Sequence, residues 1–346
     1  MNAVSLLAGL IAWGERAPVP DALTRAAIAW LVGRTDRNLA TLTAADEAAF
    51  AASMADFPVA VHTDTANAQH YELPPDFFVR TLGPQRKYSC CYYDAPESTL
   101  AEAETRALDL TMDHAGLADG QRILELGCGW GSLSLAMARR FPRASITAVS
   151  NSHGQRRFIA AEAARQGLGN LTVVTADMNG FAPQGRFDRI VSVEMFEHMA
   201  NWRDLLARAA GWLEDDGRMF IHVFTHRTGS YRFDSADKTD WIAQHFFTGG
   251  LMPSHGLIRR FDDLFTVEEE WRWSGAHYRR TAEDWLALFD QRIDEIDPIL
   301  ASVYGNDRMA LWRRRWRLFF LATSGLFGHA GGQSWGVSHY RLKPVR

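Results

Sequence analysis

Hydrophobic and polar positions divide the chain into a helical first part and a longer part of mixed character. Within residues 1–80, apolar residues recur at three- and four-residue spacing over 22–31 and 44–54, which is typical of helices rather than strands. Prolines at 18, 20 and 58 separate these segments. The pattern predicts a helical N-terminal extension over residues 1–80. Its apolar run over 3–13 is too short to cross a bilayer and favours an amphipathic or docking helix.

After residue 120, short apolar segments alternate with helical ones. Strands followed by helices indicate βαβ units and a parallel sheet. We therefore expect an α/β fold in which residues 81–223 form a doubly wound, Rossmann-like core. The expected strands are 122–126, 145–149, 171–175, 187–193 and 218–223, and the expected helices are 132–140, 154–166 and 202–213.

The alternation stops after about residue 223. The stretch to 254 is aromatic and has the character of a loop, and 266–273 has the pattern of a strand. Helical patterns follow over 281–293 and 307–327, and a last strand pattern covers 334–342. We expect residues 224–330 to form a substrate-binding cap with a return strand near 266–273. Residues 331–346 then supply the final strand of the sheet.

Composition narrows the class of protein. The net charge of -4 provides no overall basic field, so no nucleic-acid partner is expected. The basic run over 313–317 predicts a solvated or salt-bridged helix face. Three cysteines without a spaced pattern exclude a disulfide scaffold and favour a reducing compartment, which predicts a cytoplasmic protein. Twelve tryptophans and twenty phenylalanines suit either a large core or an apolar substrate cavity.

A glycine-rich loop follows the first expected strand, with Glu125 before Gly127, Gly129 and Gly131. Glycines at a strand-to-helix turn let the backbone turn sharply and approach a ligand closely. Dinucleotide enzymes use similar loops, and a structural turn without a ligand is the plain alternative. The acidic residue before the first glycine resembles the loop of S-adenosylmethionine (SAM) methyltransferases.

The ends of the next two strands offer further cofactor partners. Asn151 and Gln155 follow the second strand, where a nucleotide cofactor needs ribose partners. Many methyltransferases have an acidic residue there, and a helix N-cap is the alternative interpretation. Asp177 and Met178 follow the third strand, where Asp177 can accept from an adenine amino group and Met178 can pack on the ring. The alternative for Asp177 is a loop carboxylate that caps the next turn.

Three ionisable residues, Glu194, Glu197 and His198, follow the fourth strand. Ligands bind at this end of such sheets, and neighbouring Glu and His side chains can hold or remove a proton near neutral pH. Their spacing is weak evidence for a metal, and we expect none. A surface carboxylate pair with a core histidine is the alternative. Cys90, which lies before the core, is by itself more typical of a small buried residue than of a nucleophile.

Taken together and in this order, four motifs resemble the cyclopropane-fatty-acid synthase superfamily of class I SAM methyltransferases. The motifs are Tyr88-Ser89-Cys90 with Tyr92, the loop from Glu125 to Gly131, Asn151 with Gln155, and Met195-Phe196-Glu197-His198. The resemblance implies SAM as the cofactor and S-adenosylhomocysteine as the product. It also implies that Tyr88 and Ser89 belong to the cofactor site.

Within this superfamily, several details resemble the coclaurine N-methyltransferase branch. They include Cys90-Cys91, the C-terminal Trp335-Gly336-Val337-Ser338-His339, and Glu194, whose position is normally glycine in the lipid enzymes. A carboxylate in a dry pocket can bind an ammonium ion and help to take its proton. The resemblance therefore implies an amine site of Glu194, Glu197 and His198. Its expected aromatic walls are Phe246, Phe247, Phe327 and Trp335.

The lipid branch remains an alternative, as a cyclopropane-fatty-acyl-phospholipid synthase or a lipid C-methyltransferase. The resemblance implies that these enzymes hold a bicarbonate ion at the positions of Cys90, Glu197, His222 and Tyr278, and this chain has those residue types. Bicarbonate and membrane contact are expected only under this alternative. A second alternative is a SAM-binding protein without catalytic activity.

We therefore expect a SAM-dependent N-methyltransferase that acts on a small cyclic or aromatic amine by direct methyl displacement. A homodimer docked through the N-terminal helices is left open by the sequence.

Overall fold

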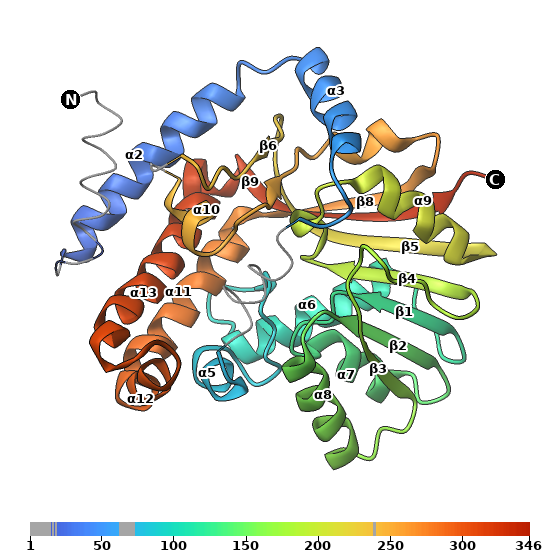
Figure 1. Cartoon of the computed structure of the whole chain (residues 1–346), viewed down its shortest axis with the longest axis horizontal. Coiled ribbons are helices and arrows are strands. Elements are labelled where there is room, and N and C mark those ends of the chain that lie inside the picture. Colours follow the sequence, from blue (N-terminus) through green and yellow to red (C-terminus); the bar gives the residue numbers. More distant parts are fainter. Residues whose placement is uncertain (1–14, 16, 18, 62–72, 238–239) are drawn as a thin grey trace.

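In the described part of the chain, a seven-stranded sheet forms the centre of the fold (Figure 1). The computed structural model describes residues 15, 17, 19–61, 73–237 and 240–346. The strand order is β3-β2-β1-β4-β5-β9-β8, with β1 to β5 parallel and β9 antiparallel to both β5 and β8. The predicted α/β fold with a doubly wound sheet is confirmed. The strands are β1 (Arg122–Leu126), β2 (Ser145–Ser150), β3 (Leu171–Thr175), β4 (Phe187–Val193), β5 (Leu213–His226), β8 (Phe265–Ser274) and β9 (Trp335–Pro344).

Helices cover both faces of the sheet because its central strands are apolar on both sides. On one face, Ile123 and Phe220 pack with residues of α6 (Leu100–His114) and α7 (Ser132–Arg140). On the other face, Leu124 and Ile221 pack with α9 (Trp202–Trp212). The helix α8 (His153–Arg165) packs with Leu135 of α7 and Ala148 of β2 through Ile159 and Ala163. The carboxyl ends of the parallel strands remain open between these layers.

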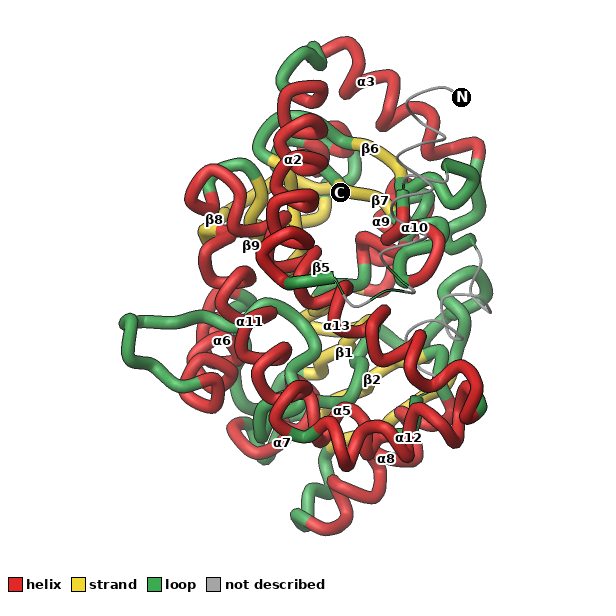
Figure 2. Tube along the Cα trace, turned by 90° about the vertical axis from the view of Figure 1, so that its left-hand side faces the viewer, coloured by secondary structure: helices red, strands yellow, loops and turns green. Residues whose placement is uncertain are grey.

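A second group of helices packs beside those strand ends. The cluster is strongly aromatic: Trp285 of α11, Trp316 and Phe320 of α13 and Phe77 of α5 are fully buried together. In the side view of Figure 2, α11, α12 and α13 lie in front of the sheet. The helices are α5 (Pro75–Thr81), α10 (Trp241–His245), α11 (Gly275–Gln291), α12 (Ile293–Tyr304) and α13 (Asn306–Gly328).

The N-terminal helices α2 (Asp21–Leu39) and α3 (Ala44–Ser53) are joined to the rest of the fold by ion pairs and buried polar contacts. Arg25 of α2 pairs with Glu283 of α11, and Asp21 pairs with Arg317 of α13. On α3, the Glu47 carboxylate accepts hydrogen bonds from Ser230. The expected docking helix over residues 3–13 lies outside the described residues.

The expected secondary structure was wrong or incomplete in places. The sequence interpretation missed α5, α6 and α12, and α12 has a proline at its centre, Pro298, which ordinarily signals a helix end. The expected loop over 224–254 contains α10 and a small hairpin-like pair, β6 (Tyr231–Arg232) and β7 (Leu251–Met252). Strand β5 begins at Leu213 rather than at 218, although Glu214, Asp215 and Asp216 are unfavourable in strands.

The basic run on α13 forms the salt-bridged face that the sequence predicts. Arg313 pairs with Asp297, Arg315 pairs with Glu15, and Arg317 pairs with both Asp21 and Asp290. Of the helices in the described ranges, none combines the length and apolar character that a membrane crossing requires.

Candidate active site

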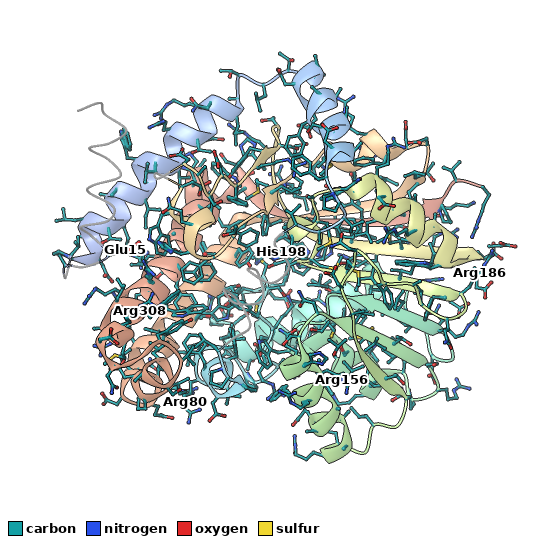
Figure 3. The ribbon with its side chains drawn as sticks, viewed as in Figure 1. Glu15, Arg80, Arg156, Arg186, His198 and Arg308 are labelled. Carbon is teal, nitrogen blue, oxygen red and sulfur yellow. The ribbon has the colours of Figure 1, made fainter. Side chains whose placement is uncertain are left out.

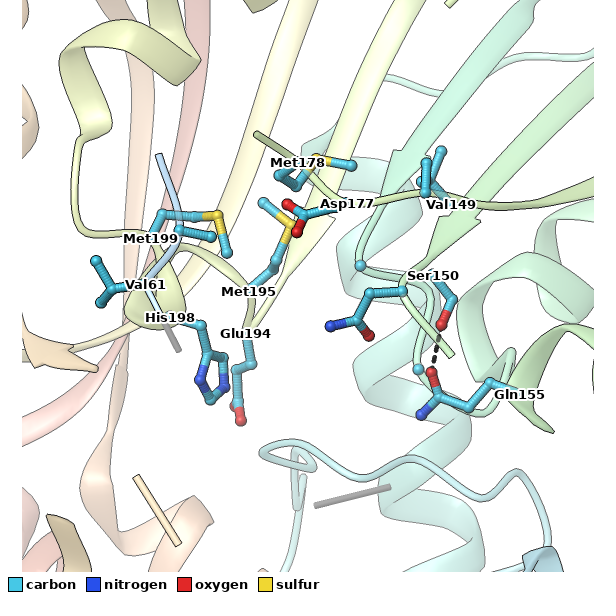
Figure 4. A pocket seen from close by; sticks show the side chains of 15 residues that line it. Val61, Val149, Ser150, Gln155, Asp177, Met178, Glu194, Met195, His198 and Met199 are labelled. Carbon is cyan, nitrogen blue, oxygen red and sulfur yellow. Dashed lines mark hydrogen bonds between the residues drawn. The ribbon is translucent and has the colours of Figure 1, made fainter. Parts of the chain in front are cut away.

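A cavity lies at the carboxyl ends of β1, β2, β3 and β4 (Figure 4). This is the edge where ligands bind in open α/β sheets, because the loops that leave neighbouring strands diverge there. The structure brings eight of the predicted site residues together in its lining. They are Gly127, Gly129, Asn151, Gln155, Asp177, Met178, Glu194 and His198.

The glycine-rich loop leaves room for a ligand at one position. Apart from its two chain neighbours, no described residue has an atom within 4 Å of a Cβ atom added to Gly129, and Gly129 has a φ of 51°. At Gly131, by contrast, a Cβ atom would lie 2.7 Å from Ile159 Cγ1, so this glycine permits the close packing of α7 on α8. Gly129 therefore gives the backbone its open approach to the cavity, whereas Gly131 serves packing.

At the end of β2, Gln155 presents an unsatisfied group. Ser150 Oγ lies 2.6 Å from Gln155 Oε1 and donates to it, while Gln155 Nε2 is buried without a partner among the described residues. The N-cap alternative also holds, because Ser152 Oγ accepts from the Gln155 backbone N–H. Neighbouring Asn151 also lines the cavity.

At the end of β3, Asp177 has the geometry of the capping alternative while it also lines the cavity. Its Oδ1 accepts the Asn179 backbone N–H at 2.8 Å, and the side chain is exposed. Met178 beside it is buried at 8% exposure. A nucleoside cofactor fits this donor set, because Gly129 leaves open space and Gln155 has an unpaired buried amide. Among the described residues, no cluster of three or more His, Cys, Asp or Glu side chains could hold a metal ion.

Glu194 lies at the wall of the cavity and is held by three donors. The Cys90 backbone N–H donates to Glu194 Oε1 at 2.9 Å, and His222 Nε2 lies 3.2 Å from the same oxygen. The Tyr278 hydroxyl donates to Glu194 Oε2 at 2.6 Å. Burial raises the pKa of Glu194, and the nearby Lys87 ammonium and these donors oppose that shift.

The backbone at Glu194 is strained. Its φ of 46° lies in the left-handed region that glycine adopts without cost, and a non-glycine residue there costs about 1–2 kcal/mol. The residue comes directly after β4, and its N–H donates to the His222 carbonyl at 2.8 Å. Strained residues of this kind concentrate at functional sites. The Glu194 carboxylate is thus held in place by a backbone conformation that is unfavourable for a residue other than glycine.

The two other predicted catalytic residues differ in their surroundings. Glu197 is fully buried, and its Oε1 accepts the Phe224 backbone N–H at 2.8 Å. Burial, and then the charge of Glu194, raises the pKa of Glu197 well above its usual range, so Glu197 is neutral and Glu194 carries the charge. Burial lowers the pKa of His198 to about 4, so its ring is neutral at pH 7. His198 lies in the middle of the molecule and faces the cavity with Glu194 (Figures 3 and 4).

The expected substrate-pocket residues divide into two groups. Cys90, His222 and Tyr278 surround Glu194, and the Tyr278 ring stacks on Phe327 at 4.2 Å between centroids. Phe247 stacks on His198 at 4.5 Å. In contrast, the contacts of Phe246 include stacking on Phe319 of α13, and those of Trp335 include His226 and His329. These last two rings belong to the aromatic core beside the site.

Four expected cofactor residues do not line the cavity, and Gly131, which serves packing, is one of them. Glu125 is buried at 2% exposure and accepts a hydrogen bond from Ser134 Oγ, and burial raises its pKa to about 7. The Tyr88 ring packs against Phe78 and Trp285. Ser89 Oγ accepts from Lys87 Nζ at 2.6 Å. Their part in cofactor binding stays a prediction.

Sequence reasoning missed Lys87, which is almost fully buried at 1% exposure. Its Nζ also donates to the Cys90 carbonyl at 2.6 Å, so it braces the segment that donates to Glu194. A lysine before the Tyr-Ser-Cys motif was visible in the sequence, but nothing there indicated that the lysine is buried. His339 and His114, described below, were missed for the same reason.

Comparison with known proteins agrees with this site. The profile of the family described as mycolic acid cyclopropane synthetase matches residues 61–328. The chain belongs to this family. The predicted family, the class I methyltransferase fold and SAM as the cofactor are confirmed, and the chain is a SAM-dependent methyltransferase.

The relatives include amine and lipid enzymes. The (S)-coclaurine N-methyltransferase of Thalictrum flavum subsp. glaucum is 35% identical over 295 residues, which cover 84% of this chain and 82% of the relative. The cyclopropane-fatty-acyl-phospholipid synthase of Escherichia coli K12 is 30% identical over 78% of this chain and 66% of the relative. A crystal structure of coclaurine N-methyltransferase bound to N-methylheliamine and S-adenosylhomocysteine superimposes with a TM-score of 0.93 at 32% identity. It covers 97% of this chain and 99% of that chain.

Proposed function

We propose that the protein is an N-methyltransferase of a small cyclic or aromatic amine. The observation that carries this proposal is the Glu194 carboxylate, an anion fixed by Cys90, His222 and Tyr278 at the wall of the cavity. The similar (S)-coclaurine N-methyltransferase and the superimposed coclaurine N-methyltransferase support the same chemical class.

Glu194 first binds the protonated amine. A carboxylate oxygen can accept two hydrogen bonds, and Oε2 receives one from Tyr278, so it retains capacity for the substrate ammonium. The raised pKa of Glu194 makes it a better base than an ordinary carboxylate. Transfer of the ammonium proton to Glu194 then frees the nitrogen lone pair for attack.

His198 and the aromatic rings orient the amine. The neutral His198 ring can accept a hydrogen bond from the substrate ammonium beside Glu194. Phe247 behind His198 and Phe327 behind Tyr278 form apolar walls against which a flat substrate can lie. Glu197, being neutral, does not compete with Glu194 for the cation but supports the same segment through Phe224.

The cofactor is held by the loop and strand ends. When bound, SAM supplies a methyl group on a positively charged sulfur, and this charge disappears on transfer. Gly129 gives backbone access, Gln155 and Asn151 serve the ribose, and Asp177 and Met178 serve the adenine. The buried surroundings of Glu194 exclude water, which strengthens each electrostatic contact. These contacts align the substrate nitrogen for direct displacement of the methyl group.

The lipid alternative is weakened by the position of Glu194. The resemblance implies that lipid enzymes hold bicarbonate beside Cys90, Glu197, His222 and Tyr278. In this chain, Cys90, His222 and Tyr278 all contact the Glu194 carboxylate, so a tethered carboxylate stands where the free anion would bind.

Further parts of the proposal concern organisation. Residues 224–330 form the substrate cap on the core of 81–223, with 1–80 as the N-terminal extension. We propose a cytoplasmic location, which the buried free thiols of Cys90, Cys91 and Cys128 support. A homodimer stays a prediction.

The proposal is tested by incubating the protein with SAM and a panel of cyclic and aromatic amines. N-methylated amine and S-adenosylhomocysteine should form in a one-to-one ratio, as read by mass spectrometry. Release of S-adenosylhomocysteine with none of the amines would refute the proposal and favour the non-catalytic alternative.

A further inference from the structure

Three histidines form an unbroken line from Glu194 towards the outside of the protein. His222 Nε2 lies 3.2 Å from Glu194 Oε1, and His222 Nδ1 lies 2.8 Å from His339 Nε2. His339 Nδ1 lies 2.8 Å from His114 Nδ1. His222 and His339 are fully buried, whereas His114 is partly exposed. The line therefore joins the buried carboxylate to a partly exposed histidine at the C-terminal end of α6.

The strand register produces this line. Val193 of β4 pairs with His222 of β5, which pairs in turn with His339 of β9. Side chains of register partners project to the same face of a sheet, so the two rings meet. That face is covered by α6, whose last residue is His114. The line thus crosses the sheet at right angles to its strands, starting at the residue after β4.

Burying His222 and His339 completely and His114 in part is costly compared with burying apolar side chains of similar size. The hydrogen bonds along the line offset this cost. They do not explain why histidines, rather than apolar residues, occupy these positions. Burial lowers the pKa of His222 and of His339 well below the usual range and that of His114 to about 4. All three rings are thus neutral at pH 7.

A neutral imidazole donates from one nitrogen and accepts at the other. Both ring nitrogens of His222 and of His339 are linked to a neighbouring group. The N–H donors of the line therefore have two consistent orientations. In one, every donor points towards Glu194; in the other, every donor points towards His114. In the second orientation each ring carries its proton on the other nitrogen, so one orientation becomes the other when a proton enters at one end of the line and another proton leaves at the opposite end.

We propose that His222, His339 and His114 carry the substrate proton from Glu194 to solvent. This proposal rests on the amine methyltransferase function. The transfer starts from the orientation in which every donor points towards His114: protonated Glu194 gives its proton to His222 Nε2, and His222 Nδ1 gives one to His339 Nε2. His339 Nδ1 gives one to His114 Nδ1, and His114 Nε2 releases one to water. Glu194 is again ionised, every ring is again neutral, and the donors now point towards Glu194, the orientation in which His222 Nε2 donates to the carboxylate. Each ring returns to its other tautomer before the next proton leaves.

The outer end of the line is suited to release. His114 stacks flat on Trp271, with ring centroids 3.9 Å apart and planes 3° apart, which fixes the ring. The charged groups that act on His114 are Asp113, Glu269, Arg341 and Arg106, and those that act on the inner rings include Lys87. The low pKa of His114 favours giving a proton to water over retaining it.

The test replaces His114 with alanine, which removes the outer end of the relay and leaves Glu194 and its three donors in place. At pH 7 the amine arrives as an ammonium ion, so kcat should fall by at least about tenfold. At a pH above the amine's own pKa it arrives neutral and the product carries the proton away, so kcat should approach that of the wild type. Imidazole in the buffer should restore turnover at pH 7.

His114→Gln is a second variant that keeps a hydrogen bond to His339 but cannot exchange tautomers, and it should show the same defect. His255→Ala is the matched control, because His255 is also partly exposed and hydrogen-bonded, to Ser338, but is not linked to Glu194. It should retain wild-type turnover at both pH values.

The outcomes separate this proposal from the proposed function. Wild-type turnover in both His114 variants at pH 7 would overturn the relay alone. A defect that is equal at both pH values and does not respond to imidazole would also overturn it, since it would indicate a structural role. Absence of amine methylation by the wild type would overturn the function and the relay together.

Discussion

At the scale of single residues, Glu194 is the central residue of the proposed mechanism. A buried carboxylate is stable as an anion only where donors surround it, and Cys90, His222 and Tyr278 supply them. The strained φ of 46° adds a cost that a glycine would avoid. The carboxylate is therefore retained against both desolvation and backbone strain, which is the pattern expected of a functional residue.

Replacing Glu194 with glutamine should lower amine turnover at least about tenfold, because an amide can neither pair with an ammonium ion nor take its proton. Affinity for SAM should change little. Steady-state kinetics and calorimetric titration with SAM check the two parts. Turnover at the wild-type level would remove Glu194 from the mechanism.

Replacing Glu194 with glycine should give a different result. Glycine suits the backbone conformation and leaves an anion-sized space beside Cys90, His222 and Tyr278. Added bicarbonate should then restore part of the lost turnover. Glu194→Gln is the matched control, because its side chain still fills the space. An equal response of the two variants to bicarbonate would contradict the anion-site interpretation.

At the scale of elements, the sequence predicts where the strands end but not which distant residues contact those ends. Strands β1, β3 and β4 have the predicted bounds because they are short apolar runs between turn residues. This placed Gly129, Gln155, Asp177 and Glu194 at one sheet edge. The sequence does not predict the side-chain contacts, because they depend on tertiary packing. Examples are the hydrogen bonds of Lys87 with Cys90, of Tyr278 with Glu194 and of His339 with His222.

The loop after β1 yields a prediction about cofactor binding. Gly129→Val should abolish SAM binding because the side chain would project into the cavity. Gly167→Val is the matched control, since Gly167 also has a positive φ, 68°, and open space around its Cβ position but does not line the cavity. Calorimetry should show SAM binding only to the control. Normal SAM affinity in a folded Gly129→Val variant would refute the site.

The junction of β1 and α7 yields a prediction about stability. Burial raises the pKa of Glu125 from 4.5 to about 7. The stabilisation that protonated Glu125 contributes is therefore fully present below pH 4.5 and is lost as pH rises to about 7. This loss lowers the free energy of unfolding by about 3 kcal/mol. Glu125→Gln should remove this loss, so its stability relative to the wild type should increase between pH 5 and pH 8.

Urea unfolding at the two pH values measures this difference. Glu97→Gln, at an exposed carboxyl, is the control and should follow the wild type. A Glu125→Gln variant that loses as much stability as the wild type between pH 5 and pH 8 would show that Glu125 is not the titrating group.

At the scale of the whole molecule, the sheet and the aromatic helices serve different purposes. The sheet brings the expected cofactor residues to one edge, and helices α11 and α13 place Tyr278, which donates to Glu194, and Phe327, which stacks on Tyr278, beside that edge. The sequence predicted both parts and their order. It could not predict which aromatic residues contact the site residues. Phe247 stacks on His198 and Phe327 stacks on Tyr278, whereas Phe246 and Trp335 pack in the aromatic core.

The central claim is that nitrogen, rather than a lipid alkene, receives the methyl group. The most direct measurement offers methyl-labelled SAM to the protein with a cyclic amine such as a tetrahydroisoquinoline and vesicles of unsaturated phospholipid in one vessel. We predict that the label enters the amine and that the lipid remains unlabelled. Label in the lipid alone would contradict the account, and the Glu194 carboxylate would then need a different explanation.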